Sequence, residues 1–287
     1  MTAIAELLAP HVRDLGGFKV RRVLPGMPRQ TVGPFIFFDH MGPVQFAPGA
    51  GVDVRPHPHI GLATVTYLFE GALLHRDSLG NVQRIAAGDV NWMTAGRGIV
   101  HSERSPSEDR ATGARMHGLQ TWVALPRVDE DAAPSFTHIE SARLPVLERD
   151  NARITVVAGH AFESRAPTPV CSDTLYAAIE FSGPSSLRIE AEHEERALYA
   201  VEGPLALDDQ PIPEAHMAVL KPDTPVTLRA DGPARAMLVG GARMDGPRFI
   251  WWNYVASLRE RIEQAKDDWR EQRFGKVPGE TEFIPLP

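Results

Sequence analysis

Two short pairs of polar residues could each place two metal ligands on one face of a strand. The first pair lies in His57-Pro58-His59 and the second in His101-Ser102-Glu103. Residues i and i+2 of a β-strand point to the same side, so each pair presents both of its side chains together. Two such strands facing each other across a small barrel would bring three imidazoles and a carboxylate to one point. This donor set suits a first-row divalent ion such as Fe(II), Mn, Ni, Cu or Zn.

The sequence around the two pairs favours such a barrel over isolated core histidines. Residues 60–69 form a β-rich run that ends at a Glu70-Gly71 turn, and Gly96 and Gly98 stand just before the second pair. Glycines at such corners allow a strand to bend sharply, which a closed barrel requires. We therefore expect His57, His59, His101 and Glu103 to bind a metal ion.

These stretches resemble a known family. RPHPHIGLATVTYLFEG and GDVNWMTAGRGIVHSE are similar to the cupin superfamily, and within it to the pirins. The resemblance implies an early His-x-His motif, a later third histidine and, in pirins, a carboxylate ligand two residues after it, where Glu103 stands. RRVLPGMPRQTVGPFIFFDHMGP, ARMHGLQTWVALP and the C-terminal GPRFIWWNYVASLRERIEQAKDDW also resemble pirin sequences, so the similarity extends over nearly the whole chain.

One position departs from the family pattern. Most cupins carry a glutamate a few residues after the His-x-His motif, and here that position is Ala63. Alternation counted from His59 predicts that Ala63 points inward with Gly61, Val65 and Tyr67. The expected site thus keeps its four ligands but lacks an inward carboxylate. Its apolar wall favours an aromatic or hydrophobic ligand over a sugar.

Strand-like runs separated by Gly and Pro predict an all-β fold. The resemblance implies a bicupin, with two packed β-barrel or jelly-roll domains and a C-terminal helix. The proline-bearing acidic stretch 126–134 is the expected connector. The expected domains are a metal-binding cupin at 1–130, a cupin-like domain without metal at 131–245, and a helix and tail packing on the barrels at 246–287. Candidate strands of the first half are 18–23, 35–38, 63–69, 72–76 and 118–125.

The second β-rich region echoes the first. Residues 197–203 parallel residues 65–71, and both runs end in Glu-Gly. This alignment puts Ile189 and Ala191 opposite the first histidine pair, while His193 and His216 form no spaced pair. We therefore expect a second barrel without metal.

Near the C-terminus the hydrophobic period changes to that of a helix. Apolar residues recur at steps of three and four, as on one face of an amphipathic helix. They are Val255, Leu258, Ile262, Ala265 and Trp269. We expect this helix to pack on the barrels, with Trp251 and Trp252 at its entry, and the tail after Gly275 to run along the surface as a strap.

Composition limits the classes of partner. The 287-residue chain has a formal net charge of −7 and no basic cluster, which argues against direct nucleic-acid binding. The single cysteine, Cys171, rules out an intramolecular disulfide framework and fits a reducing compartment. We expect a cytoplasmic protein, because the N-terminus lacks a secretory leader and no apolar run approaches the ~20 residues that span a bilayer.

Four protein ligands would leave coordination positions open on the metal ion, and this favours an enzyme that acts on a small molecule. The resemblance implies an Fe(II) dioxygenase of the quercetin 2,3-dioxygenase type, acting on a flavonol or a related phenolic or enediol substrate. Gln120 is a candidate hydrogen-bond partner beside the ligands, whereas the spacing of His40, His75 and His117 does not recruit them as ligands. The alternative is a non-catalytic, iron-dependent redox-sensing or regulatory protein that binds a protein partner.

Overall fold

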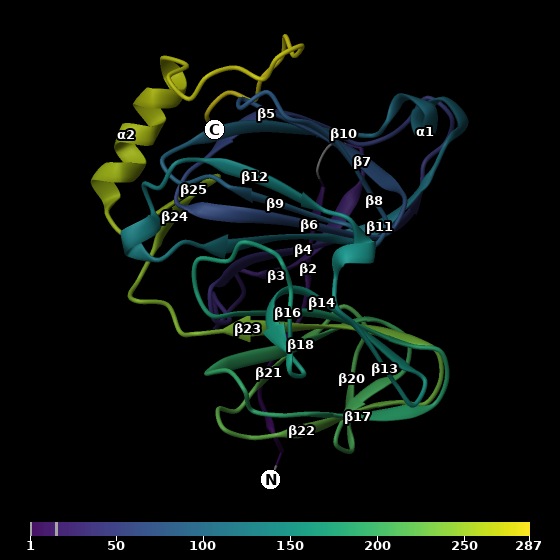
Figure 1. Ribbon diagram of the computed structural model, residues 1–287. Helices are drawn as coiled ribbons and strands as arrows, with labels where there is room; N and C mark the ends of the chain where they lie inside the picture. The colour runs from purple at the N-terminus through teal and green to yellow at the C-terminus, as the bar shows by residue number, and fades with distance from the viewer. Residues whose placement is uncertain (1, 15–16) are drawn as a thin grey trace. The chain divides into compact units, whose positions relative to one another are not determined.

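The computed structural model describes residues 2–14 and 17–287 (Figure 1). The described chain is mostly β-structure and falls into two compact units that are not contiguous in sequence. We call the unit built from Met41–Ser141 and Met244–Pro287, with the short stretch before Arg21, the N-terminal barrel. The C-terminal barrel consists of Arg21–His40, Ala142–Arg243 and the N-terminal residues up to Arg13.

The N-terminal barrel has two sheets (Figure 1). The larger sheet follows the order β12 (Ser135–Ile139), β9 (Val90–Thr94), β6 (Leu62–Glu70), β11 (Arg115–Ala124), β4 (Phe35–Gln45), β3 (Lys19–Leu24) and β2 (His11–Asp14). Residues 11–13, 21–24 and 35–40 of this sheet are counted with the other unit. The smaller sheet follows the order β5 (Asp53–His59), β10 (Ile99–Arg104), β7 (Ala72–Asp77) and β8 (Val82–Ala86). Two short helical segments join the strands, namely α1 (Ser107–Thr112) and the 3₁₀ turn η1 (Arg127–Asp129). Apolar side chains from both sheets, among them Leu68, Leu73 and Ile85, form one core cluster.

The C-terminal barrel repeats the two-sheet plan. Its larger sheet has the order β1 (Ile4–Leu8), β21 (Met217–Leu220), β18 (Glu195–Glu202), β23 (Ala234–Gly241), β16 (Thr174–Phe181), β14 (Ala152–Ala161) and β13 (Val146–Arg149), with β15 (Ser164–Arg165) paired to β14. Its smaller sheet has the order β17 (Ser185–Ile189), β22 (Val226–Ala230), β19 (Leu205–Leu207) and β20 (Gln210–Ile212). A 3₁₀ turn, η2 (Ser141–Arg143), precedes β13. The expected all-β architecture with two barrels is confirmed.

The internal echo in the sequence corresponds to equivalent strands. β6 ends at Glu70 and β18 ends at Glu202, and each is followed by a glycine with a φ of +83°. A side chain is strained at this φ, whereas glycine adopts it freely. The Glu-Gly turn therefore closes the same hairpin in both barrels.

The C-terminal helix is shorter than the periodic pattern predicts. α2 (Arg259–Arg270) begins after Leu258, whose exposed fraction is 62%, and buries Ile262, Ala265 and Trp269. Val255 lies instead in β25 (Tyr254–Ala256), which pairs with β24 (Phe249–Trp251). The expectation that Val255 and Leu258 belong to the helix was wrong, because a short hairpin uses apolar residues at a spacing that also fits a helix.

The residues after Gly275 run along the N-terminal barrel, as expected of a strap. The Ile284 amide donates to the Pro56 carbonyl at 2.8 Å, and the Trp269 indole Nε1 donates to the Ile284 carbonyl at 3.0 Å. The Glu280 carboxylate accepts from Arg104 at 2.7 and 2.9 Å. We call residues 276–287 the C-terminal strap.

Candidate metal centre

The two sequence pairs lie on neighbouring strands of one sheet. β5 and β10 pair in antiparallel fashion, with His101 opposite His57 and Ile99 opposite His59. The three imidazole rings lie with their centroids 4.4, 4.9 and 5.0 Å apart, and one ligand atom from each ring lies within 4.8 Å of the others. All three side chains are buried. The structure thus brings His57, His59 and His101 together.

Glu103 faces the same interior but stands outside this group. On β7, Asp77 lies opposite His101 and His75 lies opposite Glu103, so these four side chains share one face of the sheet. The Glu103 carboxylate is buried and accepts a hydrogen bond from Thr66 at 3.1 Å. Burial raises the pKa of Glu103, against smaller lowering effects of His75 and Thr66. Among the described residues, the ligand atoms that converge within 4.8 Å here are those of the three histidines, without Glu103.

Burial keeps the three imidazoles in the neutral form that binds metals. It lowers the pKa of His57 to about 4. Burial, and next the neighbouring His57, lower the pKa of His59 well below its ordinary value; a backbone hydrogen bond with Asn253 acts the other way. Burial followed by the surrounding imidazoles does the same for the pKa of His101. At neutral pH each ring therefore has a lone pair for a metal ion without first losing a proton.

A chain of hydrogen bonds orients His101. His75 Nε2 lies 3.0 Å from Asp77 Oδ2, and His75 Nδ1 lies 3.4 Å from His101 Nδ1. Burial would raise the pKa of Asp77, but hydrogen bonds from His75 and Asn81 outweigh it and hold that pKa below its usual value. An ionised carboxylate can only accept, so His75 donates from Nε2 and receives the Nδ1 proton of His101. The lone pair of His101 then lies on Nε2, on the far side of the ring.

The direction of these lone pairs fits a metal ion. His101 Nε2 is buried and has no hydrogen-bond partner in the described part of the chain. His57 is oriented in a similar way, because its Nδ1 lies 2.9 Å from the Arg55 carbonyl oxygen and must donate to it. Metal-ligating histidines commonly donate their second ring nitrogen to a carbonyl, a carboxylate or another acceptor. The residues present therefore fit a divalent metal ion held by Nε2 of His57 and His101.

Sequence reasoning missed His75 and Asp77 as orienting residues. The spacing of His75 in the sequence did not recruit it as a ligand. The available signal was the i, i+2 spacing of His75 and Asp77 on one strand, which places both on the same face. Phe136 stacks on His75, with ring centroids 4.3 Å apart and planes at 12°, and so fixes the ring further.

The inward face of β6 differs from the expected one. Thr66 contacts Glu103, and Leu68 belongs to the barrel core, so the even-numbered residues of β6 point inward. The expectation that Ala63, Val65 and Tyr67 face the site was wrong. Alternation does not continue from His59, because β5 ends there and Gly61, at a φ of +67°, turns the chain before β6 begins.

The wall beside the histidines is therefore mixed rather than apolar. Thr64 and Thr66 lie opposite Trp122 and Gln120 on β11. Trp122 meets His59 edge to face, with ring centroids 5.1 Å apart. Gln120 contacts Thr66 at 2.7 Å, and Thr66 in turn contacts Glu103. Gln120 thus lies next to the site through its contact with Thr66.

Comparison with known proteins places the chain in a family. The family model named Pirin matches residues 17–123, and the model of the pirin C-terminal cupin domain matches residues 176–275. A pirin-like protein from Caulobacter vibrioides is 48% identical over 280 residues, which make up 96% of each chain. The chain belongs to the pirin family.

Solved structures agree with this assignment. This pirin superposes on a quercetin 2,3-dioxygenase from Acinetobacter baumannii with a TM-score of 0.92 and 32% identity, covering 98% of this chain and 94% of that one. It superposes on a bacterial pirin from Escherichia coli, solved in complex with nickel(II), with a TM-score of 0.64 and 18% identity, covering 83% and 99% of the two chains. The second likeness supports the fold alone.

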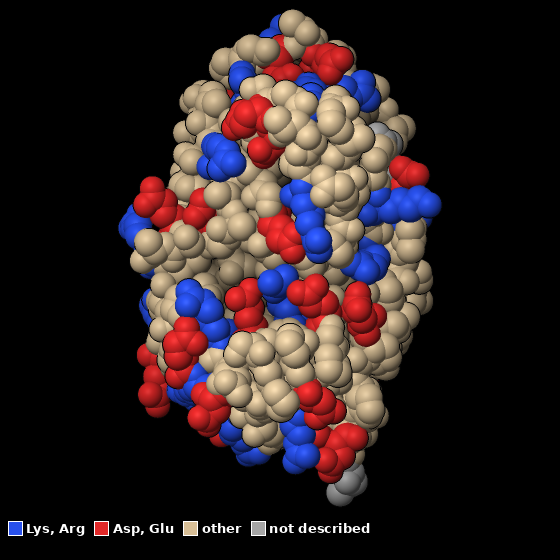
Figure 2. Space-filling model, turned by 90° about the vertical axis from the view of Figure 1, so that its right-hand side faces the viewer, with Lys and Arg blue, Asp and Glu red and all other residues tan. Residues whose placement is uncertain are grey.

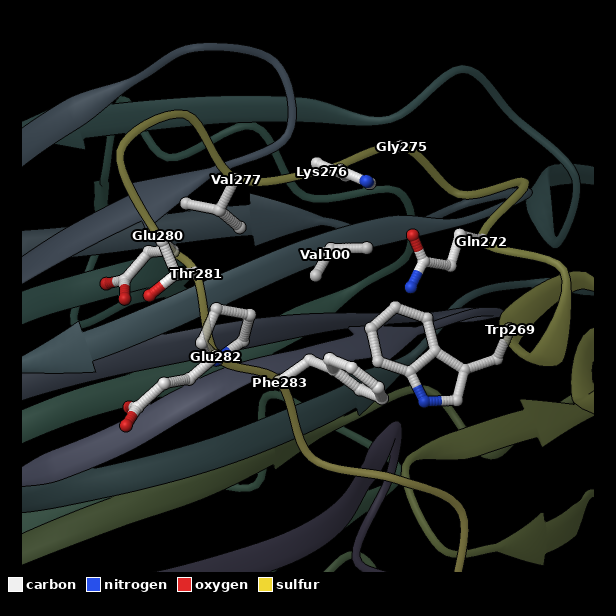
Figure 3. A pocket seen from close by; sticks show the side chains of 11 residues that line it. Val100, Trp269, Gln272, Gly275, Lys276, Val277, Glu280, Thr281, Glu282 and Phe283 are labelled. Carbon is white, nitrogen blue, oxygen red and sulfur yellow. The ribbon is translucent and has the colours of Figure 1, made fainter.

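A separate cavity lies on the outer side of the ligand strands of this pirin. It has a volume of about 340 Å³ and is lined by Pro56, Val100 and residues of α2 and the C-terminal strap. Figure 3 shows Trp269 and Phe283 side by side at this cavity, with Val100 above them in this view. Pro56 and Val100 each precede a histidine of the site, so they point to the opposite face of their strands. The cavity is therefore distinct from the interior site.

The charged side chains on the surface of this pirin agree with its negative net charge. On the face drawn in Figure 2, Lys and Arg side chains are interspersed with Asp and Glu, and that face shows no broad basic area of the kind that binds nucleic-acid phosphates. Within the described residues, no helix has the length and apolar character needed to cross a membrane.

Proposed function

We propose that this pirin is a metal-dependent dioxygenase whose expected metal is Fe(II) and whose substrate is a quercetin-like flavonol or a related phenolic or enediol compound. The observation that carries the proposal is the set of three buried, neutral imidazoles, with the lone pair of His101 directed into the barrel and left without a partner. Such a centre has room for exchangeable ligands, which a closed structural site lacks.

His57, His59 and His101 would hold the ion, and Glu103 is the proposed fourth ligand. Bound Fe(II) would supply open coordination positions at which dioxygen and a chelating substrate can meet. Mn, Ni, Cu and Zn accept the same donor types, so the donors alone do not select iron. The solved Escherichia coli pirin contains nickel(II), which is consistent with a site of this breadth.

The interior wall suits a flat phenolic substrate. Trp122 and Phe136 supply aromatic surface beside His59 and His75, and Thr64 and Thr66 add hydroxyl groups on the adjoining strand. Aromatic surface combined with a few well-placed polar groups is typical of small-molecule binding sites. The 32% identical Acinetobacter baumannii relative, which carries the name quercetin 2,3-dioxygenase, supports the same substrate class.

Metal content is the first experiment. Protein purified without added metal or chelator is analysed beside a His57→Ala/His101→Ala variant. About one iron per wild-type chain, lost in the variant, is the expected result. If neither protein holds metal and neither takes up Fe(II) anaerobically, the metal centre is disproved.

Oxygen uptake tests the activity. Iron-loaded protein is mixed with quercetin under air, and oxygen consumption is compared with that of the His101→Ala variant. Turnover well above the variant is expected. Stoichiometric iron binding without any turnover would reject the quercetinase proposal and favour the non-catalytic role with a protein partner. Capture of a protein whose binding depends on the iron oxidation state would then identify that partner.

A further inference from the structure

A second group of metal-ligating side chains lies in the C-terminal barrel. His160, Asp173 and His193 each offer a ligand atom, and these atoms lie within 4.8 Å of one another. His193 Nδ1 is 2.8 Å from Asp173 Oδ2, and His160 Nδ1 is 3.3 Å from Asp173 Oδ1. The two imidazole rings lie 4.4 Å apart between centroids. The group is separate from the three histidines of the N-terminal barrel.

The hydrogen bonds of His193 indicate that a proton or a metal ion must lie between His193 Nδ1 and the Asp173 carboxylate. His193 Nε2 lies 3.0 Å from the His160 carbonyl oxygen, which can only accept, so this nitrogen carries a proton. In the neutral ring, Nδ1 then presents a lone pair to the Asp173 carboxylate at 2.8 Å. Two acceptors at that distance repel each other unless a proton or a metal ion lies between them. The His193 side chain is only 1% exposed, so water screens this repulsion little.

His193 is also oriented as a metal ligand should be. Its Nε2 donates to a backbone carbonyl and its Nδ1 faces the other donors, which is the second-nitrogen arrangement common to metal-bound histidines. His57 in the first site shows the same arrangement with its ring nitrogens exchanged.

The spacing of the donors suits a tetrahedral ion. Zn–N and Zn–O bonds of about 2.0–2.1 Å place neighbouring ligand atoms of a tetrahedron about 3.3 Å apart. The distance from His160 Nδ1 to Asp173 Oδ1, 3.3 Å, matches this spacing. The distance from His193 Nδ1 to Asp173 Oδ2, 2.8 Å, is shorter, so the Asp173 carboxylate must move slightly away from His193 when an ion binds. Asp173 and His160 are 38% and 34% exposed, so water can complete the coordination shell.

The backbone holds the three residues in place. His160 follows Gly159, whose φ is +70° and where a Cβ would lie 1.6 Å from the Thr174 carbonyl oxygen, so β14 and β16 approach closely only because this residue is glycine. The Asp173 carbonyl accepts from the Ala242 amide at 3.1 Å. His193 lies in a loop with four glutamates between residues 190 and 195, and Glu190 and Glu192 line the same small hollow as His193. Glu190 and Glu195 are paired with arginines, so the added negative charge beside His193 comes chiefly from Glu192 and Glu194.

One neighbouring cation must move when a metal ion binds. Arg165 Nη2 lies 3.4 Å from His160 Nδ1 and occupies part of the space in front of that nitrogen. Arg165 is exposed and lies in a two-residue strand, so its side chain can swing into solvent.

We propose that His160, Asp173 and His193 form a second binding site for a first-row divalent metal ion, of the two-histidine, one-carboxylate type. Imidazole and carboxylate donors suit Zn(II) and its neighbours in the first transition row. This proposal departs from the expectation of a second barrel without metal, which rested on Ile189 and Ala191 opposite the first histidine pair and on the lack of a spaced pair at His193 and His216. Here the donors come from three separate segments of the chain, so no short motif indicates them.

Zinc retention after equilibrium dialysis against micromolar Zn(II) tests the proposal in the full-length chain. The His57→Ala/His101→Ala variant removes the first site, and we expect it to retain one equivalent of zinc. Adding His160→Ala or Asp173→Asn to that variant should abolish retention. Both residues are partly exposed, so neither substitution leaves a large cavity. His216→Ala is the matched control, because His216 also contacts a backbone carbonyl, that of Glu214 at 2.9 Å, and belongs to no such cluster among the described residues.

The outcomes show whether a metal ion or a proton lies between His193 and Asp173. Loss of zinc in the His160→Ala and Asp173→Asn proteins, with retention in the His216→Ala protein, supports the site. If the His57→Ala/His101→Ala variant retains no zinc, or if it keeps its zinc when His160 and Asp173 are replaced, the proposal is overturned. In that case a proton on His193 neutralises the contact with Asp173. The result does not depend on whether the first site is a dioxygenase.

Discussion

His75 contributes to the first site without being one of its expected ligands. It receives the Nδ1 proton of His101 and donates to Asp77, and so directs His101 Nε2 into the barrel. Removing a hydrogen-bond partner of a metal-bound histidine typically weakens metal binding about 10–100-fold. We expect this range for His75→Phe, which retains a ring to stack on Phe136.

Competitive titration of the apoprotein with Fe(II) or Zn(II) measures this effect. The control is His138→Phe, because His138 bonds Asn91 at 2.8 Å rather than one of the three clustered histidines. Equal weakening in both variants would show that His75 only fills space.

The lowered histidine pKa values predict how the apoprotein responds to acid. In the unfolded chain these histidines take up protons near pH 6.5, whereas in the folded chain the pKa of His57 is about 4. Between these values unfolding binds protons, so the free energy of unfolding falls as the pH decreases, by up to about 1.4 kcal/mol per pH unit for each such group. Glu103, whose pKa is raised by burial, acts in the opposite sense.

Chemical denaturation of the apoprotein between pH 7 and pH 4 checks this sign. The His57→Leu variant should lose stability less steeply than the wild type, whereas replacement of His11, which is exposed on β2, should leave the slope unchanged. A wild-type slope that persists in the His57→Leu variant would mean that the acid sensitivity comes from other groups.

At the level of strands, sequence patterns predicted more of the fold than of the site's surroundings. The five candidate strands of the first half all occur, because alternating or apolar runs between turn residues determine strands locally. Four have ends within three residues of those predicted, whereas β4, predicted at 35–38, continues to Gln45. The phase of β6 could not be predicted in this way. One left-handed residue, Gly61, breaks the alternation, and a count from His59 then assigns every later side chain to the wrong face.

His75, which orients His101, could not be predicted from the sequence for a different reason. His75 reaches His101 through the pairing of β7 with β10, which no local pattern specifies. The same holds for His160, Asp173 and His193, which meet only when three segments of the C-terminal barrel are in place.

Gly61 gives a direct test at the level of the strand. Its φ is +67°, and a Cβ there would lie 2.0 Å from the Val255 carbonyl oxygen, so Gly61→Ala must displace backbone as well as adopt a strained φ. Gly80 has a φ of +89° but no atom within 4 Å of its Cβ position. We expect Gly80→Ala to cost about 1 kcal/mol of stability from backbone strain alone and Gly61→Ala to cost clearly more.

Thermal unfolding of the two apoproteins, followed by metal titration, compares them. Gly61→Ala should also weaken metal binding, because β5 ends at His59, two residues earlier. Equal losses of stability would show that the close approach to Val255 is relaxed at no cost.

At the level of the whole chain, the C-terminal strap returns to strands formed some 180 residues earlier. Arg104 donates to both carboxylate oxygens of Glu280, at 2.9 and 2.7 Å, and Ser102 donates to Glu280 at 3.0 Å. The Glu280 side chain is 10% exposed. Glu282 contacts the same Arg104 once, at 3.2 Å, and is 57% exposed. The two glutamates therefore form a matched pair that differs in burial and geometry.

We expect Glu280→Gln to lower the free energy of unfolding by about 1–2 kcal/mol, since it replaces a bidentate, charge-assisted contact in a partly buried place. Glu282→Gln should change it by less than about 0.5 kcal/mol, as is usual for an exposed ion pair. Hydrogen bonds from Arg104 lower the pKa of Glu280, so its contribution is present at neutral pH and disappears as the pH falls through that lowered pKa. Urea denaturation at pH 7 and again at acidic pH should therefore show a difference between wild type and Glu280→Gln that shrinks on acidification. A difference that is the same at both pH values would assign the effect to packing of the strap rather than to the charge of Glu280. The hydrogen bond from Ser102 to Glu280 does not require that charge.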